Sequence, residues 1–332
     1  MHTIKLSNGR CFVCKPEQTI LDAAREHGIA LEHSCRTGRC GVCKAQVLEG
    51  TTKNLTWHES LGSDEKAENF ILTCCVTALS DVTLDIEDIG VLGRIEVKTL
   101  PCRISKLEVL CSDVIEATLR TPPASQLTYL PGQYIDVIGK NGDRRSYSVA
   151  NAPRADGLLK LQIRKIPEGI FSNYWFYEAK VNDLLRLEGP LGTFCLRPSQ
   201  ASQLVFLATG TGIAPIQAML EQLEIKSTEV NYDQIHVYWG VPTKNDLYWM
   251  PSYPKLSIRF IPVLSQELNS ENAKAYVQDA VLADRIALHD AVVYACGSEV
   301  MIASARSKLI AAGLNPKDFH SDAFLSSNQI LT

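Results

Sequence analysis

Apolar and polar positions alternate differently in three successive parts of the chain. In residues 1–92, three short alternating runs predict strands, and these runs are Thr3–Leu6, Phe12–Lys15 and Val82–Ile86. The Asn8-Gly9 pair between the first two runs predicts a hairpin turn. Residues Ile20–His27 have helical spacing, and Thr19 is placed to cap that helix while Gly28 ends it. We therefore expect a small unit of strands with one helix.

The second part is predicted to be a small antiparallel barrel. Residues 93–100, which open with Gly93, are expected to link it to the first unit. Residues 101–199 then contain many short apolar runs separated by turns with proline and glycine. These runs are Arg103–Leu110, Ile115–Arg120, Tyr134–Ile138, Arg145–Val149 and Leu159–Arg164. One helix is predicted near Phe171–Glu178.

In residues 200–332, predicted strands alternate with predicted helices. The strands are Leu204–Ala208, Ile235–Trp239, Ile258–Val263 and Val292–Ala295. The helices are Ala214–Leu223 and Glu299–Ala312, the second ended by Gly313. This alternation predicts a parallel sheet with helices on both faces.

Composition and charge exclude several classes of protein. The chain has 332 residues, of which 45% are hydrophobic and 21% charged, as in ordinary globular proteins. The formal net charge is −4, so there is no basic footprint for nucleic acid. No apolar run is long enough for a membrane span, and the first residues lack the apolar core of a signal peptide. We expect a cytoplasmic protein.

Eleven cysteines point to metal or redox chemistry, because structural disulfides are rare in a reducing compartment. Cys35, Cys40 and Cys43 have the spacing C-x4-C-x2-C, with a fourth cysteine about thirty residues later, which is the plant-type [2Fe–2S] pattern. The fourth ligand is ambiguous because Cys74 and Cys75 are adjacent.

Structural zinc is the alternative for these cysteines. Zinc sites usually combine two short C-x2-C pairs. Cys11 and Cys14 form such a pair, but they lie in a predicted strand, where residues three apart point to opposite faces. We therefore expect these two residues to act as small hydrophobic side chains, and we treat zinc as improbable.

Several motifs resemble known reductases. The segment 34–43, SCRTGRCGVC, resembles a plant-type ferredoxin, and Arg145-Ser146-Tyr147-Ser148 resembles the R-x-Y-S signature of the ferredoxin–NADP reductase superfamily. The segment 210–215, GTGIAP, and Cys296-Gly297 resemble the nicotinamide motifs of that superfamily. The segments 132–136 (GQYID), 144–153 (RRSYSVANAP) and 320–324 (HSDAF) are most similar to the CDP-6-deoxy-3,4-glucoseen reductases, with reductase components of aromatic-ring oxygenases as neighbours. The resemblance implies a β-grasp ferredoxin domain (1–92), an antiparallel β-barrel for FAD (101–199) and a parallel α/β domain for NAD(P)H (200–332).

The resemblance also implies roles for particular residues. Leu72-Thr73-Cys74 matches the register of the fourth ferredoxin ligand, so the ligands would be Cys35, Cys40, Cys43 and Cys74, with Cys75 buried and facing away. Arg145 would pair with a flavin phosphate, Tyr147 would pack on the isoalloxazine ring, and Ser148 would hydrogen-bond near flavin N5.

Further residues of the two nucleotide sites follow from the motifs. Gly169, Phe171 and Ser172 precede a helix start that could bind the flavin pyrophosphate, the alternative being a helix capped by Ser172. The nicotinamide dinucleotide would lie on Gly210, Thr211, Gly212 and Pro215, where proline replaces the third glycine of the usual loop. Cys296-Gly297 would lie beside the nicotinamide, with Cys296 and Ser148 taking part in catalysis, and Phe324 would cover the flavin.

Taken together, these expectations describe an electron-transfer enzyme. Electrons would pass from NADH, with NADPH as the open alternative, through FAD and the [2Fe–2S] cluster to a partner protein. The first candidate partner is a pyridoxamine-phosphate, iron–sulfur dehydrase acting on a CDP-hexose, and the second is an aromatic-ring oxygenase component. Residues 1–92 carry 9 basic and 13 acidic residues, which would steer a basic partner. A cysteine-rich zinc-binding module without enzymatic activity is the remote alternative.

Overall fold

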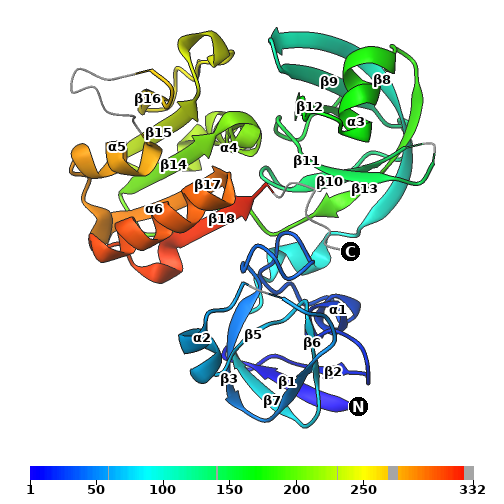
Figure 1. Ribbon diagram of the computed structural model, residues 1–332, viewed down its shortest axis with the longest axis vertical. Coiled ribbons are helices and arrows are strands. Elements are labelled where there is room, and N and C mark those ends of the chain that lie inside the picture. Colours follow the sequence, from blue (N-terminus) through cyan, green and yellow to red (C-terminus); the bar gives the residue numbers. More distant parts are fainter. Residues whose placement is uncertain (59, 140, 230, 268–275, 325–332) are drawn as a thin grey trace. The chain divides into compact units, whose positions relative to one another are not determined.

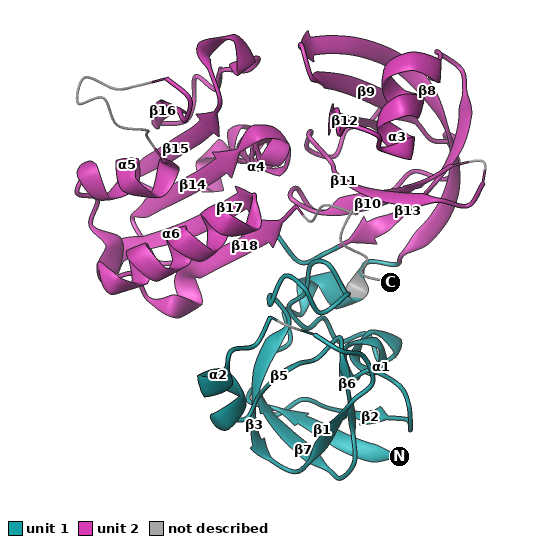
Figure 2. Cartoon of the chain, viewed as in Figure 1, with its two compact units in different colours: residues 1–96, 192–194, 325–332 teal, residues 97–191, 195–324 magenta. Residues whose placement is uncertain are grey.

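The computed structural model describes residues 1–58, 60–139, 141–229, 231–267 and 276–324. Contacts between residues divide the chain into two compact units, drawn in teal and magenta in Figure 2. Among the described residues, the first unit contains 1–96 with 192–194, and the second contains 97–191 with 195–324. We describe each unit by itself.

The first unit is built on a mixed sheet of five strands in the order β2-β1-β7-β3-β5. The strands are β1 (His2–Leu6), β2 (Cys11–Cys14), β3 (Lys44–Glu49), β5 (Phe70–Leu72) and β7 (Val82–Asp85). A small second sheet pairs β4 (Thr52–Asn54) with β6 (Val76–Ala78), and two helices accompany the sheets, α1 (Ile20–Glu26) and α2 (Ser63–Ala67). Because β1 pairs parallel with β7 and antiparallel with β2, this is the β-grasp arrangement that we expected.

Local sequence signals account for the start of this unit. The hairpin β1–β2 turns at Asn8-Gly9, where Gly9 has a φ of 81°. The Thr19 side chain accepts a hydrogen bond from the backbone N–H of Asp22 at 3.1 Å and so caps α1. In β2, Cys11 is exposed and Cys14 is buried, which confirms that the two thiols point to opposite faces.

The second unit begins with six antiparallel strands in the order β11-β10-β13-β8-β9-β12. They are β8 (Lys98–Cys111), β9 (Val114–Arg120), β10 (Tyr134–Ile138), β11 (Arg144–Ser148), β12 (Leu158–Arg164) and β13 (Leu184–Leu191). An isolated bridge between Val149 and Leu161 joins the two edges, so the sheet closes on itself as a barrel. A short helix α3 (Ile170–Asn173) continues into one π-helical turn (Tyr174–Glu178).

The remainder of this unit is a parallel sheet in the order β16-β15-β14-β17-β18. Its strands are β14 (Gln203–Thr209), β15 (Gln234–Val241), β16 (Ile258–Leu264), β17 (Ala291–Gly297) and β18 (Phe319–Ala323). The main helices are α4 (Ile213–Ile225), α5 (Val277–Ala283) and α6 (Glu299–Ala311), which Figure 1 shows beside the sheet. Side chains of α5 and α6 form one core with Val205, Leu207 and Val293, and α4 is not part of that core. Helices therefore cover both faces, as predicted.

Some elements were not anticipated from the hydrophobic pattern. These elements are β3, β4, β5, β6 and α2 in the first unit and β13, α5 and β18 in the second. Strand β8 begins at Lys98, inside the segment that we expected to be a linker. The Gly189-Pro190 pair lies within β13, and the polar residues His320 and Asp322 lie within β18, so neither strand shows a clean apolar alternation.

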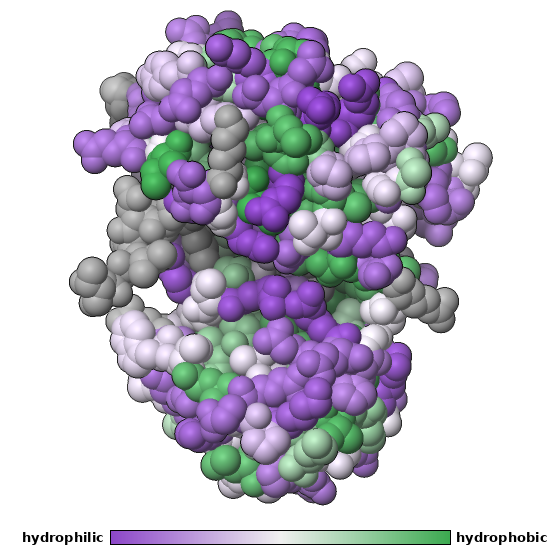
Figure 3. All heavy atoms as spheres, turned by 90° about the vertical axis from the view of Figure 1, so that its right-hand side faces the viewer, coloured by the Kyte–Doolittle hydropathy of each residue, from purple (hydrophilic) through white to green (hydrophobic). Residues whose placement is uncertain are grey.

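Hydrophilic residues predominate on the face drawn in Figure 3, and hydrophobic residues form separate groups among them. Scattered exposed apolar side chains of this kind are ordinary for a folded protein. Among the described residues, no helix has the length and apolar character that crossing a membrane would require.

Replacing Gly50 by alanine would show how closely the backbone is packed in the first unit. Gly50 has a φ of 94°, and a Cβ there would collide with the backbone carbonyl of Asp81, whereas Gly9 has a φ of 81° and open space around it. We expect Gly9→Ala to lower the free energy of unfolding by about 1–2 kcal/mol, the cost of the left-handed backbone alone. Gly50→Ala should cost about 3 kcal/mol or more, since a clash adds to the same strain.

Urea denaturation of the two variants, followed by far-ultraviolet circular dichroism, measures this difference. Equal midpoints for the two variants would contradict the predicted close approach of Gly50 to Asp81.

Candidate functional site

The cysteine loop, residues 35–43, has no regular secondary structure and is held from outside. Arg36, Gly38 and Gly41 have φ values of 58°, 75° and 70°, so the backbone turns sharply at three places. The hydroxyl of Ser60 lies 2.6 Å from the carbonyl oxygens of both Gly38 and Arg39. These contacts fix the loop from a segment twenty residues away.

Two pairs of sulfur atoms meet at this loop. Cys35 Sγ accepts hydrogen bonds from the backbone N–H groups of Thr37 and Cys40, each at 3.4 Å. The Cys40 thiol and these amides lower the pKa of Cys35 to about 5. Cys43 Sγ lies 3.2 Å from Cys74 Sγ. Four thiols in two close pairs, one pair with amide donors aimed at sulfur, fit an iron–sulfur cluster, whose four thiolates bind two irons.

Thr73 ties the second pair together. Its backbone N–H and its hydroxyl both donate to the carbonyl of Cys43, at 3.0 and 3.2 Å. Its own carbonyl accepts from the N–H of Leu21 at the start of α1. Thr73 is fully buried, so these bonds form away from water. The Leu72-Thr73-Cys74 sequence therefore positions Cys74 against Cys43, as the resemblance implied.

Cys75 is buried as expected, but it does not face away from the cysteine loop. Its Sγ lies 3.5 Å from the Sγ of Cys74, and a Cβ on Gly38 would come within 2.5 Å of it. Residues 73–75 form a turn between β5 and β6, so adjacent side chains do not alternate as they would in a strand. The expectation for Cys75 was wrong for this reason.

The flavin signature lies on β11, paired with β10 in the barrel. Tyr134 pairs with Ser148 and Val137 with Arg145. Ser148 Oγ is buried and has no hydrogen-bond partner among the described residues. A buried hydroxyl without a partner is costly, so this atom fits a site that a ligand completes. The prediction that Ser148 bonds to the flavin is consistent with it and stays a prediction.

Tyr147 and Arg145 each meet an aromatic residue of the segment 170–178. The hydroxyl of Tyr147 accepts a hydrogen bond from Trp175 Nε1 at 3.1 Å, and the two rings meet edge to face. Burial raises the pKa of Tyr147. The Arg145 guanidinium lies 5.7 Å from the centre of the Phe171 ring. Arg145 and Phe171, which were predicted from separate motifs, thus lie side by side. Trp175 was not predicted as a site residue, because a single tryptophan in a predicted helix belongs to no motif.

The helix start at Gly169 differs from the alternative that we considered. Gly169 is the N-cap of α3, and Ser172 lies inside the helix, so Ser172 is not the capping residue. The Ser172 hydroxyl instead accepts a hydrogen bond from the N–H of Ile166 at 2.8 Å and closes the preceding loop. The first amide groups of α3 have no acceptor within the helix, as anion binding would require.

The nucleotide loop follows β14, with Gly210, Thr211 and Gly212 in one 3-10 turn that leads into α4. A Cβ on Gly212 would collide with the carbonyl of Cys296, and a Cβ on Gly297 would collide with the Thr209 hydroxyl. The ends of β14 and β17 are therefore closer than side chains would allow. Such a glycine-lined approach at the carboxyl edge of a parallel sheet fits a dinucleotide, whose phosphates need bare backbone.

Pro215, Cys296 and Phe324 lie around this loop. Pro215 is in the first turn of α4, where a proline does not disturb the helix. Burial raises the pKa of the Cys296 thiol, so it stays protonated at neutral pH. The N–H of Phe324 donates to the carbonyl of Gly297 at 2.8 Å, which places the Phe324 backbone beside Gly297. The assigned roles of these residues stay predictions.

Contacts between the barrel and the parallel sheet were not foreseen. A Cβ on Gly210 would lie 3.1 Å from a guanidinium nitrogen of Arg164, the last residue of β12. Gln162 Nε2 donates to Gln217 in α4, and Gln162 Oε1 accepts from the Tyr248 hydroxyl. No sequence signal marks these residues, because neutral polar pairs between domains have no characteristic spacing.

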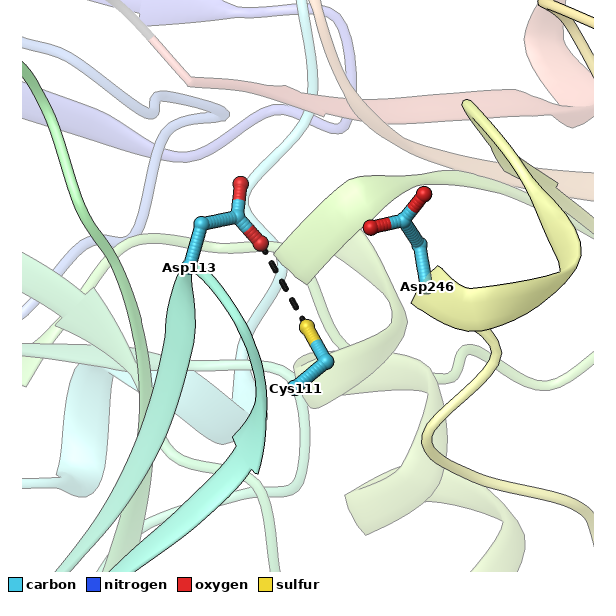
Figure 4. Close-up of side chains that lie close together, drawn as sticks. All are labelled: Cys111, Asp113 and Asp246. Atoms are coloured by element: carbon cyan, nitrogen blue, oxygen red, sulfur yellow. Dashed lines mark hydrogen bonds between the residues drawn. The ribbon is translucent and has the colours of Figure 1, made fainter.

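Figure 4 shows a group of Cys111, Asp113 and Asp246, whose ligand atoms lie within 4.8 Å of one another. Asp113 accepts from the Cys111 thiol at 3.4 Å and pairs with Arg164 at 2.8 Å. Asp246 accepts from both the N–H and the hydroxyl of Thr243. The guanidinium already neutralises Asp113, so this group is a contact between domains rather than a metal centre. Both of these bonds end on the same carboxylate oxygen, Oδ2 of Asp246.

Three protein families match the chain in succession. The 2Fe-2S iron-sulfur cluster binding domain matches residues 4–79, the oxidoreductase FAD-binding domain 101–195 and the oxidoreductase NAD-binding domain 206–307. The chain is 41% identical over 327 residues to the CDP-6-deoxy-L-threo-D-glycero-4-hexulose-3-dehydrase reductase of Yersinia pestis, covering 96% of this chain and 97% of that protein. The chain belongs to the iron–sulfur flavoprotein reductase family.

Other relatives of this reductase agree. It is 32% identical over 323 residues to the terephthalate 1,2-dioxygenase reductase component 2 of a Comamonas species, with 94% of each chain covered. The solved structure of the Amycolatopsis cytochrome P450 reductase GcoB matches with a TM-score of 0.75 at 26% identity, covering 98% of this chain and 99% of that one. The resemblance seen in the sequence is thus confirmed.

The reductase is an NADH-dependent oxidoreductase with a [2Fe–2S] cluster and FAD. When bound, FAD would supply a hydride acceptor for NADH, and the cluster would supply one-electron transfer toward a protein acceptor. The described residues fit binding and orientation of these groups. The thiols of the cysteine loop lie near Cys74, and the buried Ser148 hydroxyl has no hydrogen-bond partner among the described residues. Glycines at 210 and 212 leave the backbone of the nucleotide loop without side chains.

When a cluster thiol is removed, the reductase should lose only electron transfer from the cluster to the acceptor. We expect Cys40→Ser to abolish the reduction of cytochrome c, which takes electrons from the cluster, and to leave ferricyanide reduction at the flavin unchanged. Steady-state assays with NADH and each acceptor measure both activities. Equal loss of the two would contradict a serial chain of cofactors.

The reductase should also hold FAD less tightly without the Tyr147 ring. Tyr147→Ala removes an aromatic surface and leaves Trp175 Nε1 without its acceptor. Losing about 1.4 kcal/mol or more would weaken FAD binding about tenfold. The flavin content after gel filtration measures this effect, with the exposed Tyr177→Ala as the matched control. Unchanged flavin content would refute the stacking role of Tyr147.

Proposed function

We propose that this reductase delivers electrons to an iron–sulfur dehydrase acting on a CDP-hexose, in the reduction of a CDP-6-deoxy-3,4-glucoseen during dideoxysugar synthesis. The observation that carries the proposal is the 41% identity to proteins named dehydrase reductases, extending over 96% of the chain. The 32% identity to the dioxygenase reductase component covers nearly the same length. The higher identity to the dehydrase reductases therefore extends over the whole chain and does not come from one domain.

Within this proposal, Cys35, Cys40, Cys43 and Cys74 hold the cluster. The pairing of Cys43 with Cys74 at 3.2 Å and the amide donors to Cys35 support that set. Thiolates bound to iron also favour a reducing compartment, which supports a cytoplasmic location. Our proposed domains are 1–92, 101–199 and 200–332 with the linker 93–100, into which strand β8 of the barrel extends as far as Lys98.

The flavin and nicotinamide residues complete the proposal. FAD would contact Arg145, Tyr147 and Ser148 of β11. NADH would lie on the loop 210–212 with Cys296 and Gly297 beneath it. A 3-10 turn, Lys244–Asp246, follows β15 at the carboxyl edge of the parallel sheet. The Lys244 N–H donates to the carboxylate of Glu267 at 2.8 Å. This negative charge would repel a 2′-phosphate and so supports NADH over NADPH.

A reductase component of an aromatic-ring oxygenase is the second candidate. The terephthalate dioxygenase reductases from Comamonas, at 32% and 31% identity, favour it. Membership of the reductase family leaves no support for the non-enzymatic zinc-binding module.

Reconstitution with purified acceptors distinguishes the two candidates. We expect NADH oxidation to be coupled to deoxygenated sugar formation when the reductase is mixed with a CDP-hexose dehydrase and its substrate, and to depend on Cys40. Turnover should fall as salt concentration rises, because the acidic first unit steers the acceptor. Coupled turnover with a ring-hydroxylating oxygenase, and none with the dehydrase, would reverse the assignment.

A further inference from the structure

Cys75 has no place in the ligand set, yet its thiol adjoins that set. It is fully buried, and its Sγ lies 3.5 Å from the Sγ of Cys74. Either thiol could donate in that contact while both carry a proton. A cysteine bound to iron is a thiolate and has no proton to give. With Cys74 as a ligand, only Cys75 can be the donor in this contact.

The backbone holds Cys75 in this position from both sides. Its N–H donates to the carbonyl of Leu72 at 2.8 Å, and its carbonyl accepts from the N–H groups of Leu55 and Thr56 at 2.8 and 3.4 Å. These backbone bonds fix the residue on both sides, and its side chain is buried.

The absence of a side chain at Gly38 leaves room for the Cys75 thiol beside Cys74. A Cβ at Gly38 would come within 2.5 Å of Cys75 Sγ, so any larger residue would push the thiol away from Cys74. Gly38 also belongs to the loop that carries Cys35 and Cys40. The Cys75 thiol therefore lies between the cysteine loop and the fourth ligand.

We propose that Cys75 is a positioning residue that raises the reduction potential of the cluster by donating an S–H···S hydrogen bond to Cys74. The proposal rests on the assignment of Cys74 as the fourth ligand under the proposed function. Reduction adds negative charge to the cluster and its sulfurs, and a hydrogen bond to a ligand sulfur stabilises that charge. The hydrogen bond thereby favours the reduced state and makes electrons easier to accept from the flavin.

The test is a redox titration of the holoenzyme, followed by the electron paramagnetic resonance signal of the reduced cluster. Cys75→Ala removes the donor, and Cys75→Ser replaces it with a hydroxyl. Cys14→Ala is the matched control, because Cys14 is an equally buried thiol of the same core whose contacts are with Lys15, Gln18 and Thr77. Iron content and the visible spectrum are measured for each variant.

We expect all three variants to keep a full iron content. The midpoint potential should move to more negative values in Cys75→Ala, move less in Cys75→Ser, and stay unchanged in Cys14→Ala. A Cys75→Ala potential equal to that of Cys14→Ala would overturn the proposal. Loss of iron in Cys75→Ala would overturn it differently, by showing that Cys75 is itself a ligand.

These outcomes are separable from a failure of the proposed function. A wrong acceptor assignment leaves the midpoint potentials and iron contents of these variants as expected, since neither measurement uses the acceptor.

Discussion

The structure of the first unit depends on hydrogen bonds from other segments that hold the cysteine loop, residues 35–43, in its irregular conformation. Residues 35–43 must turn their thiols toward one place, so their backbone cannot form a helix or a strand. The missing bonds come from elsewhere: Thr73 donates twice to Cys43, and Ser60 reaches the carbonyls of Gly38 and Arg39. The sheet and α1 matter to the site mainly because they carry these anchors.

In the second unit, close approach of backbones has a comparable role. Gly212 and Gly297 let the ends of β14 and β17 meet more closely than any side chain would allow. Trp239, fully buried, adds a hydrogen bond from its indole N–H to the Gly210 carbonyl at 2.8 Å. These contacts hold the nucleotide loop in one shape, and a preformed loop reduces the entropic cost of binding.

Polar contacts join the two halves of this unit. Arg164 pairs with Asp113 and approaches Gly210, while the N–H of Ala152 donates to Glu221 in α4 at 2.9 Å. Burial raises the pKa of Glu221. Interfaces of this kind are more adaptable than a shared hydrophobic core. They suit an enzyme in which flavin and nicotinamide must come into contact and then separate.

The sequence by itself determined most of the elements, the fold class and the cofactors, and it predicted the residues of the site. Cysteine spacing, the Arg-Ser-Tyr-Ser strand and the Gly210 loop depend on neighbours within a few residues, so they are visible along the chain. Strand β13 and the polar strand β18 escaped because their neighbours in the sheets, not their own patterns, make them strands. The N-cap at Gly169 and the direction of the Cys75 thiol are set by local turns whose geometry the residue types do not specify. Which atoms face one another across 20 to 40 residues depends on packing in three dimensions, and only the tertiary structure contains that information.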